Sequence, residues 1–142
     1  GAAGKYIREY INLVCDTAVK EGDHTGFNDK PLHKYLEKEH LTQYDGLFIK
    51  AIDAVREDTI RRYRVEKARL SIRYVRFYRD FFENGEADRR ELHDLFDEWE
   101  AFGLGRMEED ADRTTTRKAL LRGKPIGINL YWHWTFEGPE IL

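Results

Sequence analysis

No proline interrupts the sequence between Pro31 and Pro125, and this interval constrains the fold more than any other feature. Proline removes a backbone donor and breaks helix interiors, so a long stretch without it leaves room for long helices. Within this stretch, apolar residues return at three- and four-residue spacings, the period of an amphipathic helix. The sequence therefore predicts an all-α fold, a bundle of about four to five helices with a short irregular or β-like C-terminal tail.

The periodic segments place the helices of the N-terminal half. Residues 3–21 form the first predicted helix, and Gly22 is a typical helix stop. A short helical turn is predicted around residues 32–36. Thr42 then has the residue type of an N-cap, with an acidic residue three positions on, and the helix that it opens is expected to end near Asp58.

The longest periodic segment, residues 59–82, carries apolar side chains around most of its circumference, which is typical of a central bundle helix. A further helix is predicted from a cap at Asp88 to a stop at Gly103. Residues 103–142 form a less regular tail in this interpretation. They include an irregular acidic stretch up to residue 115, a short helix around residues 116–121 and a strand-like end.

The predicted core follows the apolar faces of these four helices. Such faces must be buried against one another to stabilise a bundle. The residues that we expect in the core are Ile7, Tyr10, Ile11, Val14, Leu47, Phe48, Ala51, Val55, Val65, Ala68, Ile72, Val75, Leu92, Leu95, Phe96 and Trp99.

Two sets of basic residues lie along the segment 59–82. One set falls in a narrow stripe and comprises Arg62, Arg69, Arg73 and Arg76. The stripe is a candidate interface to an acidic protein, to nucleic acid or to another domain, or else a solvated face. The other set points into the apolar sector and must snorkel or find carboxylate partners. It comprises Arg61, Arg64, Lys67 and Arg79.

The charge balance argues against a dedicated nucleic-acid-binding protein. The 142 residues contain 24 Lys and Arg against 27 Asp and Glu, a net charge of −3. Proteins that bind nucleic acid normally carry a basic excess. The sequence also has neither a transmembrane run nor a signal peptide.

No catalytic constellation stands out. The acidic residues sit beside Lys or Arg on faces typical of solvated helices, so we nominate no acid/base pair. No two of the five histidines have the i, i+4 spacing of a helical zinc motif, and the acidic cluster of residues 108–112 lacks the pattern of a calcium loop. Cys15, the only cysteine, is predicted to be a small core or boundary residue. The sequence predicts no cofactor.

One aromatic cluster in the tail is a candidate for carbohydrate contact, because aromatic faces can stack on sugar rings. The cluster consists of Tyr131, Trp132 and Trp134. Aromatic side chains near a chain end also pack against the body of a protein, so both interpretations stay open.

Two stretches resemble a known family. Residues 1–10, a Gly-Ala-rich opening followed by Y-I-R-E-Y, and residues 63–74, with the pattern R-V-E-x-A-R-L-x-I-x-Y, are similar to the helical region behind the barrel in glycoside-hydrolase-like proteins grouped as domain-of-unknown-function family 4838. The resemblance covers roughly residues 1–82, and its motifs are packing patterns. No catalytic residue is carried over by it.

The resemblance implies a larger, typically bacterial and exported protein with a TIM-barrel domain, tied to polysaccharide breakdown. Residues 1–142 would then be a single helical domain in the C-terminal part of that protein. Its expected role is to pack against the barrel, to contact a partner subunit as in a homodimer, or to add a carbohydrate contact. The alternative is a free-standing interaction module that uses the arginine stripe.

Overall fold

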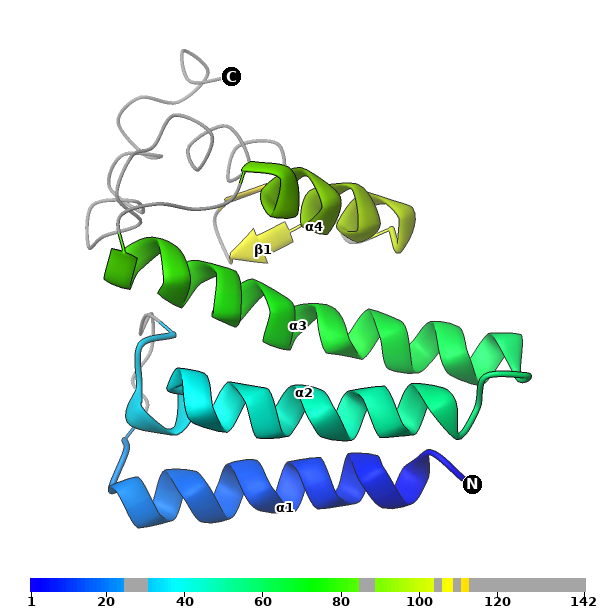
Figure 1. Cartoon of the computed structure of the whole chain (residues 1–142), viewed down its shortest axis with the longest axis horizontal. Helices are drawn as coiled ribbons and strands as arrows, with labels where there is room; N and C mark the ends of the chain where they lie inside the picture. The colour runs from blue at the N-terminus through cyan, green and yellow to red at the C-terminus, as the bar shows by residue number, and fades with distance from the viewer. Residues whose placement is uncertain (25–30, 85–88, 104–105, 109–110, 113–142) are drawn as a thin grey trace. The chain divides into compact units, whose positions relative to one another are not determined.

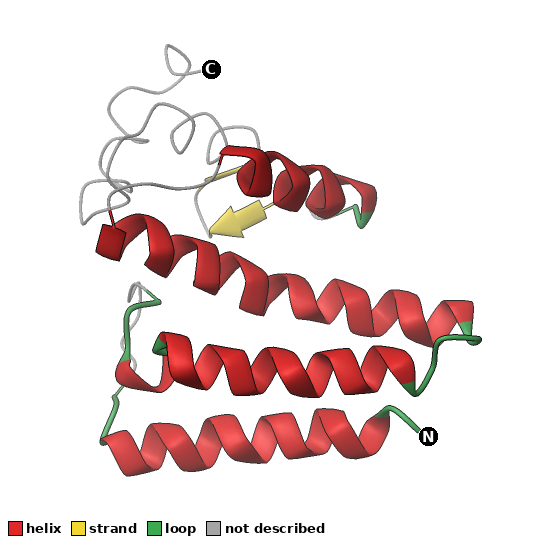
Figure 2. Ribbon diagram, in the orientation of Figure 1, coloured by secondary structure: helices red, strands yellow, loops and turns green. Residues whose placement is uncertain are grey.

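The computed structural model describes residues 1–24, 31–84, 89–103, 106–108 and 111–112. Its helices establish the all-α fold that the sequence predicts (Figures 1 and 2). The elements in chain order are α1 (Gly4–Glu21), the 3-10 turn η1 (Lys34–Leu36), α2 (Lys38–Asp53), α3 (Thr59–Asn84), α4 (Arg89–Ala101), β1 (Arg106–Glu108) and β2 (Ala111–Asp112). The chain divides into two compact units, unit 1 (Gly1–Arg79) and unit 2 (Asp80–Leu142).

Unit 1 is a bundle made by α1, α2 and most of α3. In Figure 1, α2 runs between the other two helices, and α1 and α3 both begin at the same end of the unit. Its core joins buried side chains of α2 and α3 with Ala3, the residue just before α1, and partly buried apolar side chains of α1 pack against them. The buried cluster consists of Ala3, Leu41, Tyr44, Phe48, Ala51, Val55, Val65 and Ile72.

Most of the predicted core is confirmed, with two clear corrections. Ile11 is 52% exposed, and Ala68 is also exposed. The other predicted core residues of α1, together with Val75, are half-buried. The reason lies in the packing of α1: its residues reach the core from one side only, so the edge of its apolar stripe at Ile11 remains in solvent. Cys15, predicted in the core or at its boundary, is exposed.

The predicted end of α1 is confirmed, whereas the predicted start of α2 is wrong. Gly22 ends α1 in the left-handed conformation (φ 66°), as predicted. Helix α2 begins five residues earlier than the Thr42 cap predicts, with Glu37 at the N-cap position. Thr42 lies inside the helix, and its hydroxyl donates to the carbonyl of Lys38 at 2.8 Å. The helix ends at Asp53, and a turn leads from there to α3.

Helix α3 starts with a side-chain cap. The Oδ1 atom of Asp58 accepts a hydrogen bond from the backbone N–H of Arg61 at 2.9 Å, and its Oδ2 atom lies 2.8 Å from the Arg61 guanidinium. The backbone N–H and the guanidinium of Arg61 lower the pKa of the Asp58 carboxyl, although partial burial opposes them. Arg61 thus finds the carboxylate partner that the sequence requires.

Substituting Asp58→Ala is expected to lower the melting temperature at pH 7 by roughly 4–8 °C, because the first turn of α3 loses its cap. Asp58→Asn keeps an acceptor and should lose much less. The pKa of Asp58 is lower in the folded chain than its ordinary value of 3.8, so the carboxylate stabilises the fold fully at pH values above 3.8. This stabilisation is lost as the pH falls through the pKa of the folded state. Thermal melts of both variants and of Glu57→Ala, a neighbouring exposed acid, provide the check.

Unit 2 contains α4 and a short antiparallel pair of strands. Leu92, Leu95, Phe96 and Trp99 are buried, as predicted, and Gly103 ends the helix region with φ 69°. Strands β1 and β2 pair Arg106 with Asp112 and Glu108 with Ala111, so part of the stretch that we expected to be irregular is a hairpin. The predicted helix at 116–121 and the strand-like end lie outside the described residues.

Candidate functional site

The arginine stripe of α3 has unequal members. Arg69 forms a two-point ion pair with Asp45 of α2, with Nε–Oδ1 at 2.6 Å and Nη2–Oδ2 at 2.9 Å. Arg62 is 45% exposed and lies 3.5 Å from Glu66 on its own helix. Arg73 and Arg76 are half-buried. The structure therefore places Arg69 in the bundle itself, and the interface at the stripe stays a prediction.

Of the residues predicted to point into the apolar sector of α3, Arg79 is the most deeply buried. It is 8% exposed, and its Nη1 atom donates to the carbonyl oxygen of His33 at 3.3 Å. Arg64 is exposed, and Lys67 is half-buried. Of this set, Arg61 pairs with a carboxylate, as predicted, whereas Arg79 donates to a backbone carbonyl.

The junction between α1 and η1 gathers further polar contacts. The Oδ2 atom of Asp23 accepts a hydrogen bond from the backbone N–H of Tyr35 at 2.9 Å, and its Oδ1 atom lies 3.6 Å from Nδ1 of His33. The hydroxyl of Tyr44, a fully buried residue, donates to the carbonyl of Tyr35 at 2.9 Å. These contacts join η1 and the residue before it to Asp23, just after α1, and to Tyr44 of α2. The cluster therefore holds η1 against both helices.

The ionisable groups of this junction have shifted pKa values. Burial raises the pKa of the Asp23 carboxyl, but the backbone N–H groups of Tyr35 and Lys34 and the neighbouring His33 outweigh it, so the pKa lies below its ordinary value. Burial raises the pKa of Tyr44, and the nearby Tyr35 raises it further. A hydrogen bond with Thr17 lowers this pKa but does not cancel the rise. Both shifts favour the protonation states that hold the helices together at neutral pH.

Substituting Asp23→Ala is expected to lower the unfolding midpoint in urea at pH 7, because the η1 backbone loses its acceptor. Because the pKa of Asp23 is lowered in the folded chain, the carboxylate stabilises the fold fully at pH values above its ordinary pKa of 3.8. The stabilisation is lost as the pH falls through the pKa of the folded state. The difference between Asp23→Ala and the native chain should therefore shrink on acidification. A difference that grows between pH 7 and pH 3 would contradict this account.

Among the described residues, no three His, Cys, Asp or Glu side chains form a group that could hold a metal ion. No helix in the described part of the chain is both long and apolar enough to cross a bilayer. Tyr131, Trp132 and Trp134 lie outside the described residues, as do two members of the acidic cluster, Glu109 and Asp110. The proposed carbohydrate contact is therefore untested.

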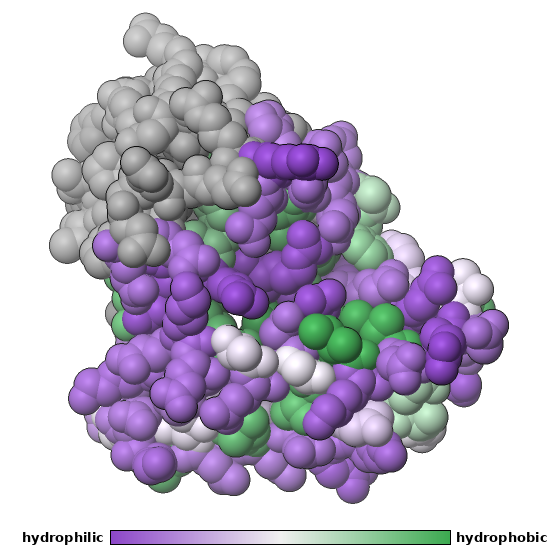
Figure 3. Space-filling model, in the orientation of Figure 1, coloured by the Kyte–Doolittle hydropathy of each residue, from purple (hydrophilic) through white to green (hydrophobic). Residues whose placement is uncertain are grey.

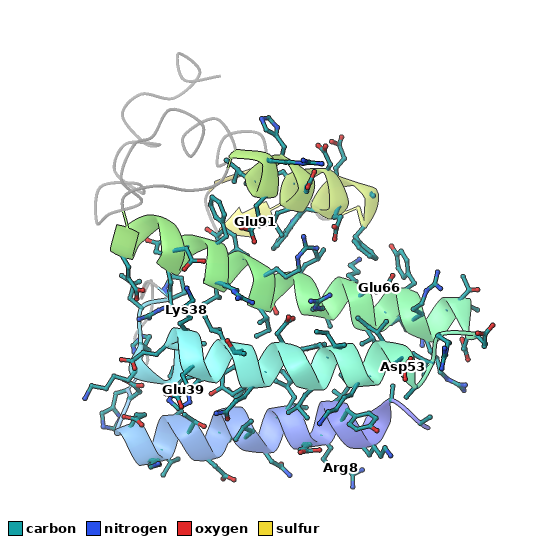
Figure 4. All side chains as sticks on the ribbon, in the orientation of Figure 1. Arg8, Lys38, Glu39, Asp53, Glu66 and Glu91 are labelled. Atoms are coloured by element: carbon teal, nitrogen blue, oxygen red, sulfur yellow. The ribbon has the colours of Figure 1, made fainter. Side chains whose placement is uncertain are left out.

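An open groove lies between the N-terminal halves of α1 and α3 and has a volume of about 470 Å³. We call it the α1–α3 groove. The branched apolar side chains in its lining are Ile7, Ile11 and Val65, and the charged side chains among its described lining residues are all arginines. The lining residues are Gly1, Ala3, Gly4, Ile7, Arg8, Ile11, Arg61, Arg64 and Val65. Figure 4 shows Arg8 projecting from the N-terminal half of α1.

The sequence contains the apolar and basic residues that line this groove, but it does not show that they lie together. Ile7 and Ile11 lie one helical turn apart, and Arg61 and Arg64 point into the apolar sector of α3. Bringing them together required the parallel placement of α1 and α3, which neither segment specifies alone. A second hollow along α1, of about 620 Å³, mixes Lys5 and Arg8 with Glu9 and Asp16 and has no such charge bias.

Comparison with known proteins adds no relative. No model of a protein family, no curated protein and no solved structure matches the chain.

Proposed function

We propose that the chain is a non-catalytic helical domain that supports a neighbouring protein domain. The observation that carries this proposal is a set of polar contacts in unit 1 that join one element to another, beside ion pairs that stay local, such as Arg62 with Glu66. Arg69 connects α3 to Asp45 of α2, and Tyr44 of α2 holds η1. Such interhelical contacts fix the relative position of helices, which suits a domain whose surface must keep its shape.

The exposed apolar side chains of unit 1 support the same proposal. Ile11 of α1, Ile49 of α2 and Ile60 of α3 are 52%, 51% and 67% exposed. Figure 3 shows apolar side chains gathered between α2 and α3 within a largely hydrophilic face. Apolar side chains that gather on one face, as they do in this view, are typical of a surface that a partner covers.

The resemblance to the glycoside-hydrolase-like family specifies the neighbour in this proposal. The domain would pack against a TIM barrel of the same exported bacterial protein, or against a partner subunit, and polysaccharide breakdown would be the task of the barrel. The free-standing module with an arginine-rich face is the second candidate. We favour the first because Arg69, near the middle of that face, already pairs with Asp45.

Three observations test the proposal. The isolated chain is expected to release no nitrophenol from nitrophenyl glycosides, and the reading frame upstream of Gly1 is expected to encode alternating strands and helices. A protein that includes both parts should lose thermal stability in its barrel when residues 1–142 are deleted. Hydrolysis by the isolated chain, or an upstream sequence without barrel-like alternation, would show the proposal to be wrong.

A further inference from the structure

We propose that the α1–α3 groove binds an acidic amphipathic helix of a partner protein or neighbouring domain. This inference rests on the proposed function and specifies the surface and the chemistry of the contact. The occupant is a helix with an apolar stripe that lies on Ile7, Ile11 and Val65, and with carboxylates on the flanks that meet the arginines.

The apolar floor favours a protein occupant. Ile11 is 52% exposed although it lines the groove, so a large part of its side chain is available to be covered. Val65 and Ala3 belong to the buried core, so the floor is continuous with the interior of unit 1 and is held rigid by it. A rigid apolar floor in an open groove is the surface on which a helix places its apolar face.

The charge on the rim specifies the sign of the occupant. Arg8, Arg61 and Arg64 line the groove, and no described residue that lines it is acidic, whereas the whole chain has a net charge of −3. Arg61 shares its charge with Asp58, while Arg8 and Arg64 are exposed. The N-terminal ends of α1 and α3 lie at the same end of unit 1 and add positive helix-dipole charge there. Carboxylates are the complementary groups.

The length of the groove suits a short helical segment. Along α1 it extends from Ala3 to Ile11, a rise of about 12 Å at 1.5 Å per residue. That distance matches roughly two turns of a docked helix, which would present apolar side chains at positions i, i+3 or i+4, and i+7. A nucleic acid would use the arginines but leave the apolar floor uncovered, so it fits the groove less well.

The test uses the chain of residues 1–142 and a fluorescein-labelled synthetic helix of about four turns. The probe has leucine at i, i+3, i+4 and i+7 with glutamate on both flanks. One control peptide has lysine in place of each glutamate, and another has serine in place of each leucine. At low salt, we expect a saturable rise in fluorescence anisotropy with the acidic, leucine-containing probe and none with either control peptide. The unlabelled probe should displace the labelled one, which shows that binding does not depend on the fluorescein label.

Matched variants locate the binding site. The double substitution Arg8→Glu with Arg64→Glu is expected to weaken probe binding at least about tenfold, because the charges of two exposed arginines on the rim are reversed. Arg56→Glu with Arg62→Glu changes the net charge equally at exposed positions outside the groove and should alter binding less than about twofold. Ile11→Ser, at an exposed position, should weaken binding without lowering the melting temperature appreciably.

Three results would overturn the inference: equal binding of the lysine peptide, equal losses in the two double variants, or no binding of the acidic probe at low salt. Stronger competition by single-stranded RNA than by the unlabelled probe would also overturn it in favour of a nucleic-acid surface. These outcomes leave the barrel-deletion test unaffected, so failure of the groove and failure of the supporting role are distinguishable.

Discussion

Replacing Phe48 with alanine is expected to destabilise unit 1 by about 3–5 kcal/mol, the typical cost of removing a buried aromatic ring. Phe48 is 3% exposed and belongs to the cluster that joins α1, α2 and α3. Its ring centroid lies 4.7 Å from that of Tyr10, so the substitution also removes an aromatic contact to α1. Because a domain of this size is stable by only about 5–15 kcal/mol, much of its stability would be lost.

The next residue provides the matched control. Ile49 lies on the same helix but is 51% exposed, and Ile49→Ala is expected to cost less than about 1 kcal/mol. Urea unfolding followed by circular dichroism measures both variants. Similar midpoints for Phe48→Ala and Ile49→Ala would mean that the core of unit 1 does not lie where the structure places it.

The sequence predicted the helices well because their period is a local property. The helix from Gly4 to Glu21 and the long helix from Thr59 onward follow directly from apolar spacing and from the stop at Gly22. Boundaries were less accurate where a polar residue had two roles. Thr42 has the residue type of a cap, yet inside a helix its hydroxyl bonds to the carbonyl four residues back, and nothing in the sequence distinguishes these roles.

Features that depend on how helices face one another could not be predicted. Ile11 belongs to the apolar stripe of α1, but its exposure is decided by the rotation of α1 against its neighbours. The α1–α3 groove depends on the same rotation, because its floor and rim come from two helices distant in sequence. Leu41 is buried in α2 although it precedes the predicted cap at Thr42, so the wrong helix start also left Leu41 out of the predicted core.

Breaking the pair between Asp45 and Arg69 is the second large effect that we expect. Asp45→Ala should destabilise unit 1 by roughly 2 kcal/mol, between the costs typical of exposed and buried pairs, because the side chains of Arg69 and Asp45 are 28% and 14% exposed. The loss arises from the arginine, which keeps its charge in a half-buried position but no longer has this carboxylate beside it. Urea unfolding at pH 7 measures the change in free energy.

A double-mutant cycle separates the pair from its surroundings. The cycle compares Asp45→Leu, Arg69→Met and the double variant, which replaces both charges by apolar side chains and should recover most of the stability that Asp45→Leu alone loses. The exposed pair of Arg56 and Asp53, 67% and 69% exposed and 3.6 Å apart, serves as the control and should show coupling below about 1 kcal/mol. Equal coupling in both pairs would show that Arg69 belongs to the surface. The arginine stripe would then regain its place as the candidate interface, because the cation at its centre would be available to a partner.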